Sequence, residues 1–205
     1  VVSGDPQAIG GELCANPTVR KLSFTGSTAV GRQLMAQCAP SIKKLSLELG
    51  GNAPFIVFAD ADVDAAVEGA LAAKYRNTGQ TCVCANRFLV EDSIYETFAE
   101  KLAARAQDLQ VGAGDEAGVQ QGPLINAAGL AKVEAHVADA LAQGAQVRCG
   151  GARHARGGNF YQPTVLTEIT PAMRVAREES FGPLAPLFRF SGEAEAIALA
   201  NATEF

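Results

Sequence analysis

The sequence predicts an α/β protein built on a parallel sheet, and two observations support that prediction: the alternation of apolar segments and the composition. Short apolar segments of strand length alternate along the chain with longer segments whose apolar residues recur at helical spacing. Such alternation favours parallel strands joined by right-handed crossovers through helices. The composition agrees, since 48% of the 205 residues are hydrophobic and 21 are glycine, as in a folded α/β protein rather than a disordered chain.

The first fifty residues are expected to alternate between strands and helices. In chain order the expected elements are a strand end at residues 1–2, a helix at 8–15, a strand at 21–24, a helix at 29–38 and a strand at 44–49. The composition then changes at the glycine pair Gly50-Gly51. We therefore expect a domain boundary that separates residues 1–51 from residues 52–205.

A second α/β unit is expected after this boundary. A strand at 55–58 precedes an alanine-rich helix that ends at Tyr75, with Asp60 or Asp62 as its N-cap. The later expected elements are a strand at 87–90, an amphipathic helix at 93–109, a helix at 127–143, strands at 147–149 and 184–190, and a helix from residue 193. Glycine-rich residues 112–123 and the stretch 160–183 are expected to form loops and short strands.

Charge and composition argue against several classes of partner. The formal net charge is −5 and no basic stripe is interleaved with aromatic residues, so we expect no nucleic-acid partner. No apolar run reaches membrane-spanning length and no signal peptide is recognised, so we expect no membrane partner. Five cysteines without a patterned spacing favour the reducing cytoplasm. The two histidines lie far apart, so no metal site is expected.

Cys82 is the first candidate for chemistry. It follows Gly79-Gln80-Thr81 at the end of the alanine-rich helix. A helix terminus or a nearby cation favours the thiolate, which is the nucleophilic form of cysteine. A free cysteine is more often a small buried hydrophobic residue, and the local pattern leaves both interpretations open.

Two further segments have local features of binding or catalysis. Gly26 and Ser27 follow a strand and begin a helix, where backbone N–H groups can bind a phosphate. Glu48 lies in an apolar strand shortly before the double glycine, which suggests that the backbone there needs unusual angles or close approach. An ordinary strand-to-helix turn and an exposed strand carboxylate are the alternatives.

These segments, taken in order, make the chain resemble the aldehyde dehydrogenase superfamily over essentially all 205 residues. The resemblance rests on the 34-residue separation of Glu48 and Cys82 and on five motifs: FTGST at 24–28, LELGGN at 47–52, GQTC at 79–82, GPLI at 122–125 and EESFGP at 178–183. Within the superfamily the chain is most similar to succinate-semialdehyde dehydrogenases, through YRNTGQTCVCANR at 75–87 and FGPLAPL at 181–187.

The resemblance implies an aldehyde-dehydrogenase-like α/β fold. Residues 1–51 would be the C-terminal part of a Rossmann-type dinucleotide-binding domain, and residues 52–205 most of a parallel α/β catalytic domain. It also implies a fragment that lacks N- and C-terminal parts of a longer enzyme, so the fragment alone is expected to have an incomplete cofactor site. The full-length parent is expected to be a homo-oligomer.

The activity implied is NAD- or NADP-dependent oxidation of an aldehyde, with succinate semialdehyde as the first candidate substrate. Cys82 would attack the aldehyde carbon, and Glu48 would activate the water that hydrolyses the resulting thioester. The implied cofactor contacts are Gly26 and Ser27 at the pyrophosphate with Thr25 beside them, Leu49 near the nicotinamide, Glu179 at the nicotinamide ribose and Phe181 against the nicotinamide.

Two more residues take implied roles. Arg76 would hold the distant carboxylate of the substrate, a task that suits the planar fork of guanidinium, although a surface arginine at a helix end is the alternative. Some members of the subgroup form a reversible disulfide between the nucleophile and a cysteine placed like Cys84. The alternative for Cys84 is a packing role in a small apolar site, and both remain open.

Other classes of function stay in view. A cysteine acyl-transfer enzyme would use Cys82 without a dinucleotide, but it needs a base, and neither His136 nor His154 lies in a motif that suggests one. A non-catalytic structural module would keep the fold alone. Within the family, the alternative is oxidation of another semialdehyde such as glutarate semialdehyde.

Overall fold

The computed structural model describes residues 1–205, and these divide into two compact units, residues 1–50 and residues 51–205. We describe each unit by itself. The division falls one residue earlier than the boundary suggested by the sequence. Gly51 lies with the second unit because its N–H donates to Glu179 and its carbonyl accepts from Asn86.

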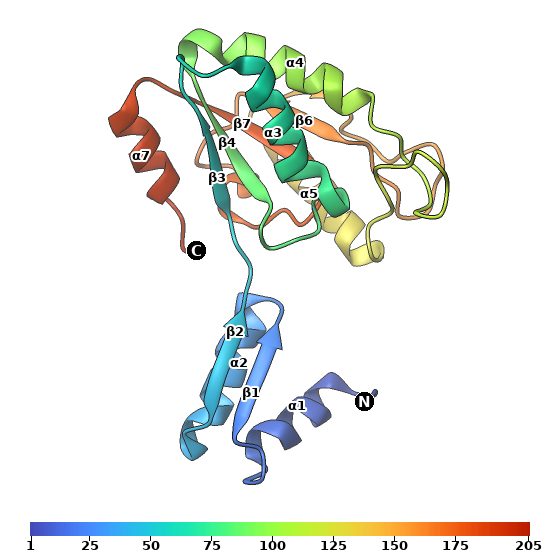
Figure 1. The fold of residues 1–205 in the computed structure, drawn as a ribbon, viewed down its shortest axis with the longest axis vertical. Coiled ribbons are helices and arrows are strands. Elements are labelled where there is room, and N and C mark those ends of the chain that lie inside the picture. Colours follow the sequence, from blue (N-terminus) through green and yellow to red (C-terminus); the bar gives the residue numbers. More distant parts are fainter. The chain divides into compact units, whose positions relative to one another are not determined.

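The first unit is a two-stranded parallel sheet with two helices (Figure 1). Its elements are α1 (Pro6–Ala15), β1 (Lys21–Thr25), α2 (Thr28–Cys38), a short 3-10 turn η1 (Ala39–Ser41) and β2 (Lys44–Glu48). The helix α2 makes the crossover that a parallel pair requires. A small core joins the helices to the sheet and consists of Cys14, Leu22 and Cys38, with Leu34 and Leu45 packed against it.

The strand end predicted at Val1 and Val2 is wrong. Both residues are exposed and lie outside any strand, and β1 pairs only with β2. Without a neighbouring strand in this chain, their backbone groups have no ladder to join, and β-branched side chains alone do not make a strand.

The second unit contains a five-stranded sheet in the order β3-β4-β7-β6-β5. The strands are β3 (Ala53–Val57), β4 (Ala85–Glu91), β5 (Gln146–Cys149), β6 (Thr164–Thr167) and β7 (Leu184–Phe190). All neighbours are parallel except β5 and β6, which are antiparallel. The expectation of a parallel sheet is therefore wrong at this edge. No helix lies between β5 and β6 to make the crossover that a parallel pair needs.

Helices cover both faces of this sheet (Figure 1). They are α3 (Val63–Tyr75), α4 (Tyr95–Gln107), α5 (Ala127–Ala142), α6 (Arg174–Arg177) and α7 (Glu193–Asn201), with 3-10 turns η2 (Arg76–Gly79) and η3 (Asp92–Ile94). Asp62, one of the two predicted caps, accepts from the N–H groups of the first turn of α3. None of the helices has the length and apolar character needed to cross a membrane.

Successive residues of the central strands enter two different cores, as the two-residue period of a strand requires. Phe88 of β4 and Leu187 of β7 pack with α3 and α4, whereas Leu89 and Phe188 pack with α5 and α7. The sheet is thus the middle layer of three, and its central strands are apolar on both faces.

Two strand boundaries differ from the sequence prediction in ways that bear on the site. β3 begins at Ala53 and includes Pro54, which an edge strand tolerates. β4 begins at Ala85, so that Asn86 and Arg87 are buried within the strand. Polar residues at the start of an apolar run resemble a loop in sequence, but here long-range hydrogen bonds satisfy them.

Candidate active site

In the first unit, the predicted site residues gather at the carboxyl ends of the two strands. Thr25, the last residue of β1, is the register partner of Glu48, the last residue of β2. The N–H of Gly26 donates to the carbonyl of Glu48 over 3.0 Å. Glu48 is exposed, in the alternating pattern of exposed and half-buried residues that β2 shows. The strand pairing therefore brings together two segments that lie more than twenty residues apart in sequence.

The turn from β1 into α2 is exposed and begins with a side-chain cap. Ser27 is the N-cap of α2, and its Oγ accepts from the N–H of Val30 over 3.3 Å. Gly26 and Ser27 are exposed. The ring of Phe24 occupies the space that a side chain at position 26 would need, because a Cβ on Gly26 would lie 2.5 Å from the Phe24 Cζ. The arrangement is a capped helix N-terminus that is open to an anion.

Leu49 packs into the side of the same helix. A Cβ on Gly31 would lie 2.6 Å from the Leu49 Cδ2, so the leucine fits only because residue 31 lacks a side chain. This contact fixes the chain directly after Glu48. Leu49 and the Gly26 turn are thereby held against the first turns of one helix.

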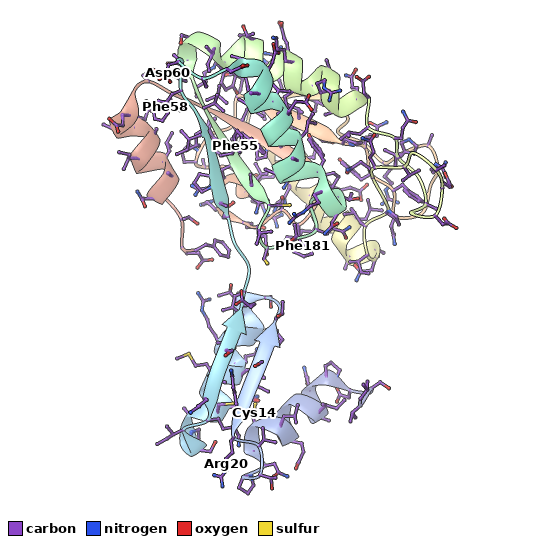
Figure 2. The ribbon with its side chains drawn as sticks, in the orientation of Figure 1. Cys14, Arg20, Phe55, Phe58, Asp60 and Phe181 are labelled. Carbon is purple, nitrogen blue, oxygen red and sulfur yellow. The ribbon has the colours of Figure 1, made fainter.

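In the second unit, the predicted site residues Cys82, Glu179 and Phe181 lie at the amino ends of strands, and Gly51 of the LELGGN motif joins them there. Gly51 precedes β3, Cys82 precedes β4, and Glu179 and Phe181 precede β7. These three strands are adjacent and parallel, so their amino ends share one edge of the sheet. Figure 2 shows Phe181 at this edge, whereas Phe58, which follows the carboxyl end of β3, lies at the other.

The segment before Cys82 has an unusual backbone. Asn77, Thr78 and Gly79 have φ values of 54°, 58° and 72°, in the left-handed region. Such a conformation is rare for a β-branched residue, and it costs on the order of 1–3 kcal/mol per strained residue unless the surroundings enforce it. Here the buried Thr78 donates from Oγ1 to the carbonyl of Gly122 over 3.1 Å. Tertiary contact, not local preference, therefore shapes this turn.

Gln80 and the GPLI motif complete that support. The side chain of Gln80 donates to the carbonyl of Pro123 over 3.3 Å and accepts from the N–H of Ile125 over 2.9 Å. Gly79 lies against the backbone of Gly182, since a Cβ on it would be 2.1 Å from the Gly182 carbonyl oxygen. The residues before Cys82 are thus wedged between the 122–125 segment and the 178–183 segment.

Cys82 is half-buried, which is inconsistent with the interpretation that it is a sealed packing residue. Its carbonyl lies against Gly51, where a Cβ would come within 2.9 Å of the oxygen. The N–H of Gly51 in turn donates to Oε1 of Glu179 over 3.3 Å. Gly51 therefore contacts both the backbone of Cys82 and the carboxylate of Glu179, and these contacts join three of the five sequence motifs.

Phe181 and Arg76 flank this cluster. Phe181 is 39% exposed and has a φ of 49°, a strained value for an aromatic residue. Arg76 is exposed and begins the η2 turn directly after α3. Both side chains are thus open to solvent, Arg76 at the start of the loop that leads to Cys82 and Phe181 in the loop before β7.

Cys84 is buried and differs from Cys82 in its surroundings. Its thiol donates to the carbonyl of Lys74 over 3.6 Å. Burial raises the pKa of Cys84, and the opposing effect of Lys74 is smaller. Both cysteines are free thiols in this structure.

The structure also reveals polar residues that the sequence prediction missed. Lys74 is fully buried, and its Nζ donates to Oδ1 of Asn86 over 2.8 Å and to Oγ of Ser180 over 3.2 Å. Burial lowers the pKa of Lys74 to about 8. A sequence signal existed, because Lys74 continues the apolar stripe of Val67, Ala70 and Leu71 at helical spacing.

The histidines take no part in the Cys82 cluster. His136 is buried with Nε2 2.9 Å from Oε2 of Glu178, and burial lowers the pKa of His136. The pKa of Glu178 is lowered to about 2, mainly by its hydrogen bond from Arg174 and also by His136. His154 accepts from the backbone of Arg156. Their hydrogen bonds give no support to a cysteine–histidine acyl-transfer pair.

Comparison with known proteins agrees with the resemblance seen in the sequence. The model of the Aldehyde dehydrogenase family matches residues 1–205. The NADP(+) succinate-semialdehyde dehydrogenase GabD of Escherichia coli is 63% identical over 205 residues, which are 100% of this chain and 42% of that protein. A glutarate-semialdehyde dehydrogenase of Pseudomonas aeruginosa is 62% identical with the same coverage.

A solved structure shows the same fold. The crystal structure of succinate-semialdehyde dehydrogenase from Burkholderia pseudomallei matches with a TM-score of 0.99 and 67% identity, and the match covers 100% of this chain and 42% of that one. The chain therefore spans less than half the length of each of these relatives. The predicted family and fold class are confirmed, and the chain belongs to the aldehyde dehydrogenase family.

Proposed function

We propose that the full-length parent oxidises a small semialdehyde with an anionic far end to the corresponding dicarboxylate, with NAD or NADP as hydride acceptor. Succinate semialdehyde is the first candidate. The observation that carries the proposal is the position of Gly51, which contacts the carbonyl of Cys82 and donates to Glu179. Gly51 thus holds the half-buried Cys82 and the Glu179 carboxylate next to each other. This arrangement suits covalent catalysis by Cys82 beside a cofactor whose ribose binds Glu179.

The residues present fit a dinucleotide. The exposed turn at Gly26 and Ser27 leads into the N-terminus of α2, where first-turn N–H groups could bind a pyrophosphate, although the Gly26 N–H is already bonded to Glu48. Glu179 uses one carboxylate oxygen for Gly51 and keeps capacity to accept from ribose hydroxyls. The exposed ring of Phe181 can pack against a flat base. The nicotinamide, when bound, supplies the acceptor for a hydride.

The reaction starts at Cys82. Its thiolate adds to the aldehyde carbon, a C–S bond forms, and the aldehyde oxygen becomes an oxyanion that the Cys82 backbone N–H stabilises. The oxyanion collapses as the hydrogen on that carbon departs with its electron pair. The product of this step is a thioester on Cys82, and two electrons have left the substrate.

Hydrolysis of the thioester is the task proposed for Glu48. Its carboxylate accepts a proton from a water molecule as the water oxygen bonds to the thioester carbon. The C–S bond then breaks, which restores the Cys82 thiolate and releases a carboxylate. Water thus supplies the second oxygen of the product.

Arg76 is proposed to select substrates that carry a second anionic group. Its guanidinium is exposed six residues before Cys82, and a planar fork suits a carboxylate because two N–H groups donate in parallel. A lysine at this position would keep the charge and lose the paired donors. The preference for a dicarboxylate product therefore depends on arginine in particular.

The test measures the appearance of reduced nicotinamide with the full-length parent and three aldehydes: succinate semialdehyde, glutarate semialdehyde and uncharged butanal. We expect kcat/KM to be highest for succinate semialdehyde, and Arg76→Lys to reduce its advantage over butanal by about 10–100-fold, the size expected for lost hydrogen bonds to a charged group. Equal use of all three aldehydes by the wild type would refute the role of Arg76. Failure with every aldehyde would refute the proposed reaction.

Glutarate semialdehyde is the second candidate because a relative of that name is 62% identical. Its chain is one methylene longer than that of succinate semialdehyde. A pocket that fits one methylene more or less discriminates by only about 10–200-fold, so the ratio of kcat/KM between the two semialdehydes decides between them.

A further inference from the structure

Lys74 is a buried cation that the proposed reaction does not use. Its side chain is wholly inaccessible to solvent, and both of its hydrogen-bond acceptors, Asn86 and Ser180, are neutral. Burial of an ammonium group without a bonded carboxylate is costly. An apolar residue on this stripe of α3 would avoid the cost, so the position of Lys74 calls for a reason other than packing.

The hydrogen bonds around Lys74 close a ring. Ser180 also donates to Oδ1 of Asn86 over 3.0 Å, and Nδ2 of Asn86 donates to the carbonyl of Gly51 over 3.0 Å. Gly51 donates to Glu179, the neighbour of Ser180. The ring therefore links α3, the start of β4, Gly51 two residues before β3 and the loop before β7.

The same ring borders the nucleophile loop. The carbonyl of Lys74 accepts from the thiol of Cys84, and a Cβ on Gly79 would lie 3.3 Å from Cε of Lys74. Lys74 thus touches the segment on either side of Cys82 as well as the loop that carries Glu179.

We propose that Lys74 is a positioning residue, which holds Ser180 and Asn86 and through them sets the Glu179 carboxylate and the Gly51 peptide beside Cys82. This inference rests on the proposed function, because it concerns the residues assigned there to the cofactor and the nucleophile. Lys74 itself is fully buried and is assigned no contact with substrate or cofactor. Its effect is expected on dinucleotide binding first, since Glu179 is the carboxylate that it helps to place.

The titratable groups that face Lys74 are the thiol of Cys84 and the carboxylate of Glu179, and Arg76 lies near Cys84. Because burial lowers the pKa of Lys74 to about 8, the ammonium form is present at neutral pH and is lost as the pH rises through about 8. The affinity of the parent for the dinucleotide should therefore fall as the pH rises above about 8. Lys74→Met has no proton to lose, so its affinity for the dinucleotide should not change as the pH rises through about 8.

The experiment titrates the full-length parent with NAD and with NADP and measures Kd by direct binding, separately from kcat and KM for the aldehyde. Lys74→Met is expected to raise Kd by about tenfold, the effect of one lost hydrogen bond to a charged group, and to leave KM for the aldehyde nearly unchanged. Lys101→Met, at an exposed lysine of α4 that pairs with Asp64, is the matched control and should bind as the wild type does.

Ser180→Ala keeps the test valid if Lys74→Met does not fold. It removes the Oγ that accepts from Lys74 and donates to Asn86, and it should also raise Kd. The double variant should bind no more weakly than the weaker single variant, because both changes break one path. Full additivity, or wild-type affinity in both single variants, would overturn the inference.

These outcomes separate the inference from the proposed function. A wild-type parent that oxidises no aldehyde but binds dinucleotide through a Lys74-dependent Kd would refute the function and leave the positioning role. A wild-type parent that oxidises aldehydes but whose Kd does not depend on Lys74 would support the proposed function and refute the positioning role.

Discussion

The two candidate regions of this molecule are built in different ways. In the first unit, the candidate residues lie at the carboxyl ends of β1 and β2, where strand pairing, the α2 cap and the Leu49 contact hold them. Most of them are exposed, namely Thr25, Gly26, Ser27 and Glu48. In the second unit, Gly51, Cys82 and Glu179 gather at the amino ends of three strands, supported by buried side chains that bond across the fold. The first arrangement is local and tolerant, and the second is long-range and strict. Variants in the two regions should therefore fail differently.

The largest effect is expected from Cys82→Ala in the second unit. Without the thiolate no C–S bond forms, so aldehyde oxidation should fall by at least about 10³-fold. Direct titration should show dinucleotide binding unchanged, because Glu179 and Gly51 remain in place. Cys149→Ala, at a buried cysteine of β5, is the control, and substantial residual turnover in Cys82→Ala would contradict a covalent mechanism.

Glu48→Gln in the first unit should separate the two half-reactions. The amide cannot accept a proton from water, so turnover should fall by about 10²–10⁴-fold, while the first hydride transfer proceeds. Rapid mixing should then show a burst of reduced nicotinamide close to one per active site, followed by a slow phase. Absence of a burst, with both phases slowed alike, would assign Glu48 to an earlier step.

Glycine substitutions compare the strictness of the two regions directly. Gly79→Ala forces a Cβ to within 2.1 Å of a backbone carbonyl at a φ of 72°, so unfolding should become easier by more than about 2 kcal/mol. Gly26→Ala meets only the far end of the Phe24 ring, which can turn aside, and should cost less than about 1 kcal/mol. Urea denaturation of the parent measures both, and equal losses would remove the distinction between the regions.

The smallest effect is expected from Cys84→Ala. Burial raises the pKa of Cys84, so its thiolate is scarce at neutral pH and reaction with Cys82 after oxidation should be slow. Loss of activity with peroxide, and its recovery with a thiol reductant, should be the same in Cys84→Ala and the wild type. If only the wild type recovers, Cys84 is the resolving partner of a redox switch.

The sequence allowed much of the fold and part of the site to be predicted. Helix positions, the Asp62 cap and the apolar strands β4 and β7 follow from patterns within a few residues. The antiparallel edge β5 was missed because strand direction depends on what connects two strands. Lys74, Asn86 and Ser180 were missed because each looks ordinary alone and gains meaning only from partners up to 106 residues away.

What the sequence determined by itself is therefore the family, the order of elements and the candidate nucleophile, since motifs, caps and periodicity are properties of neighbouring residues. Tertiary structure alone decided that Gly51 bridges Cys82 and Glu179, that a left-handed turn precedes Cys82, and that a buried lysine bonds to Ser180 beside Glu179. The physical reason is that strain and buried charge persist only where distant groups enforce and satisfy them, and a linear pattern does not contain those contacts.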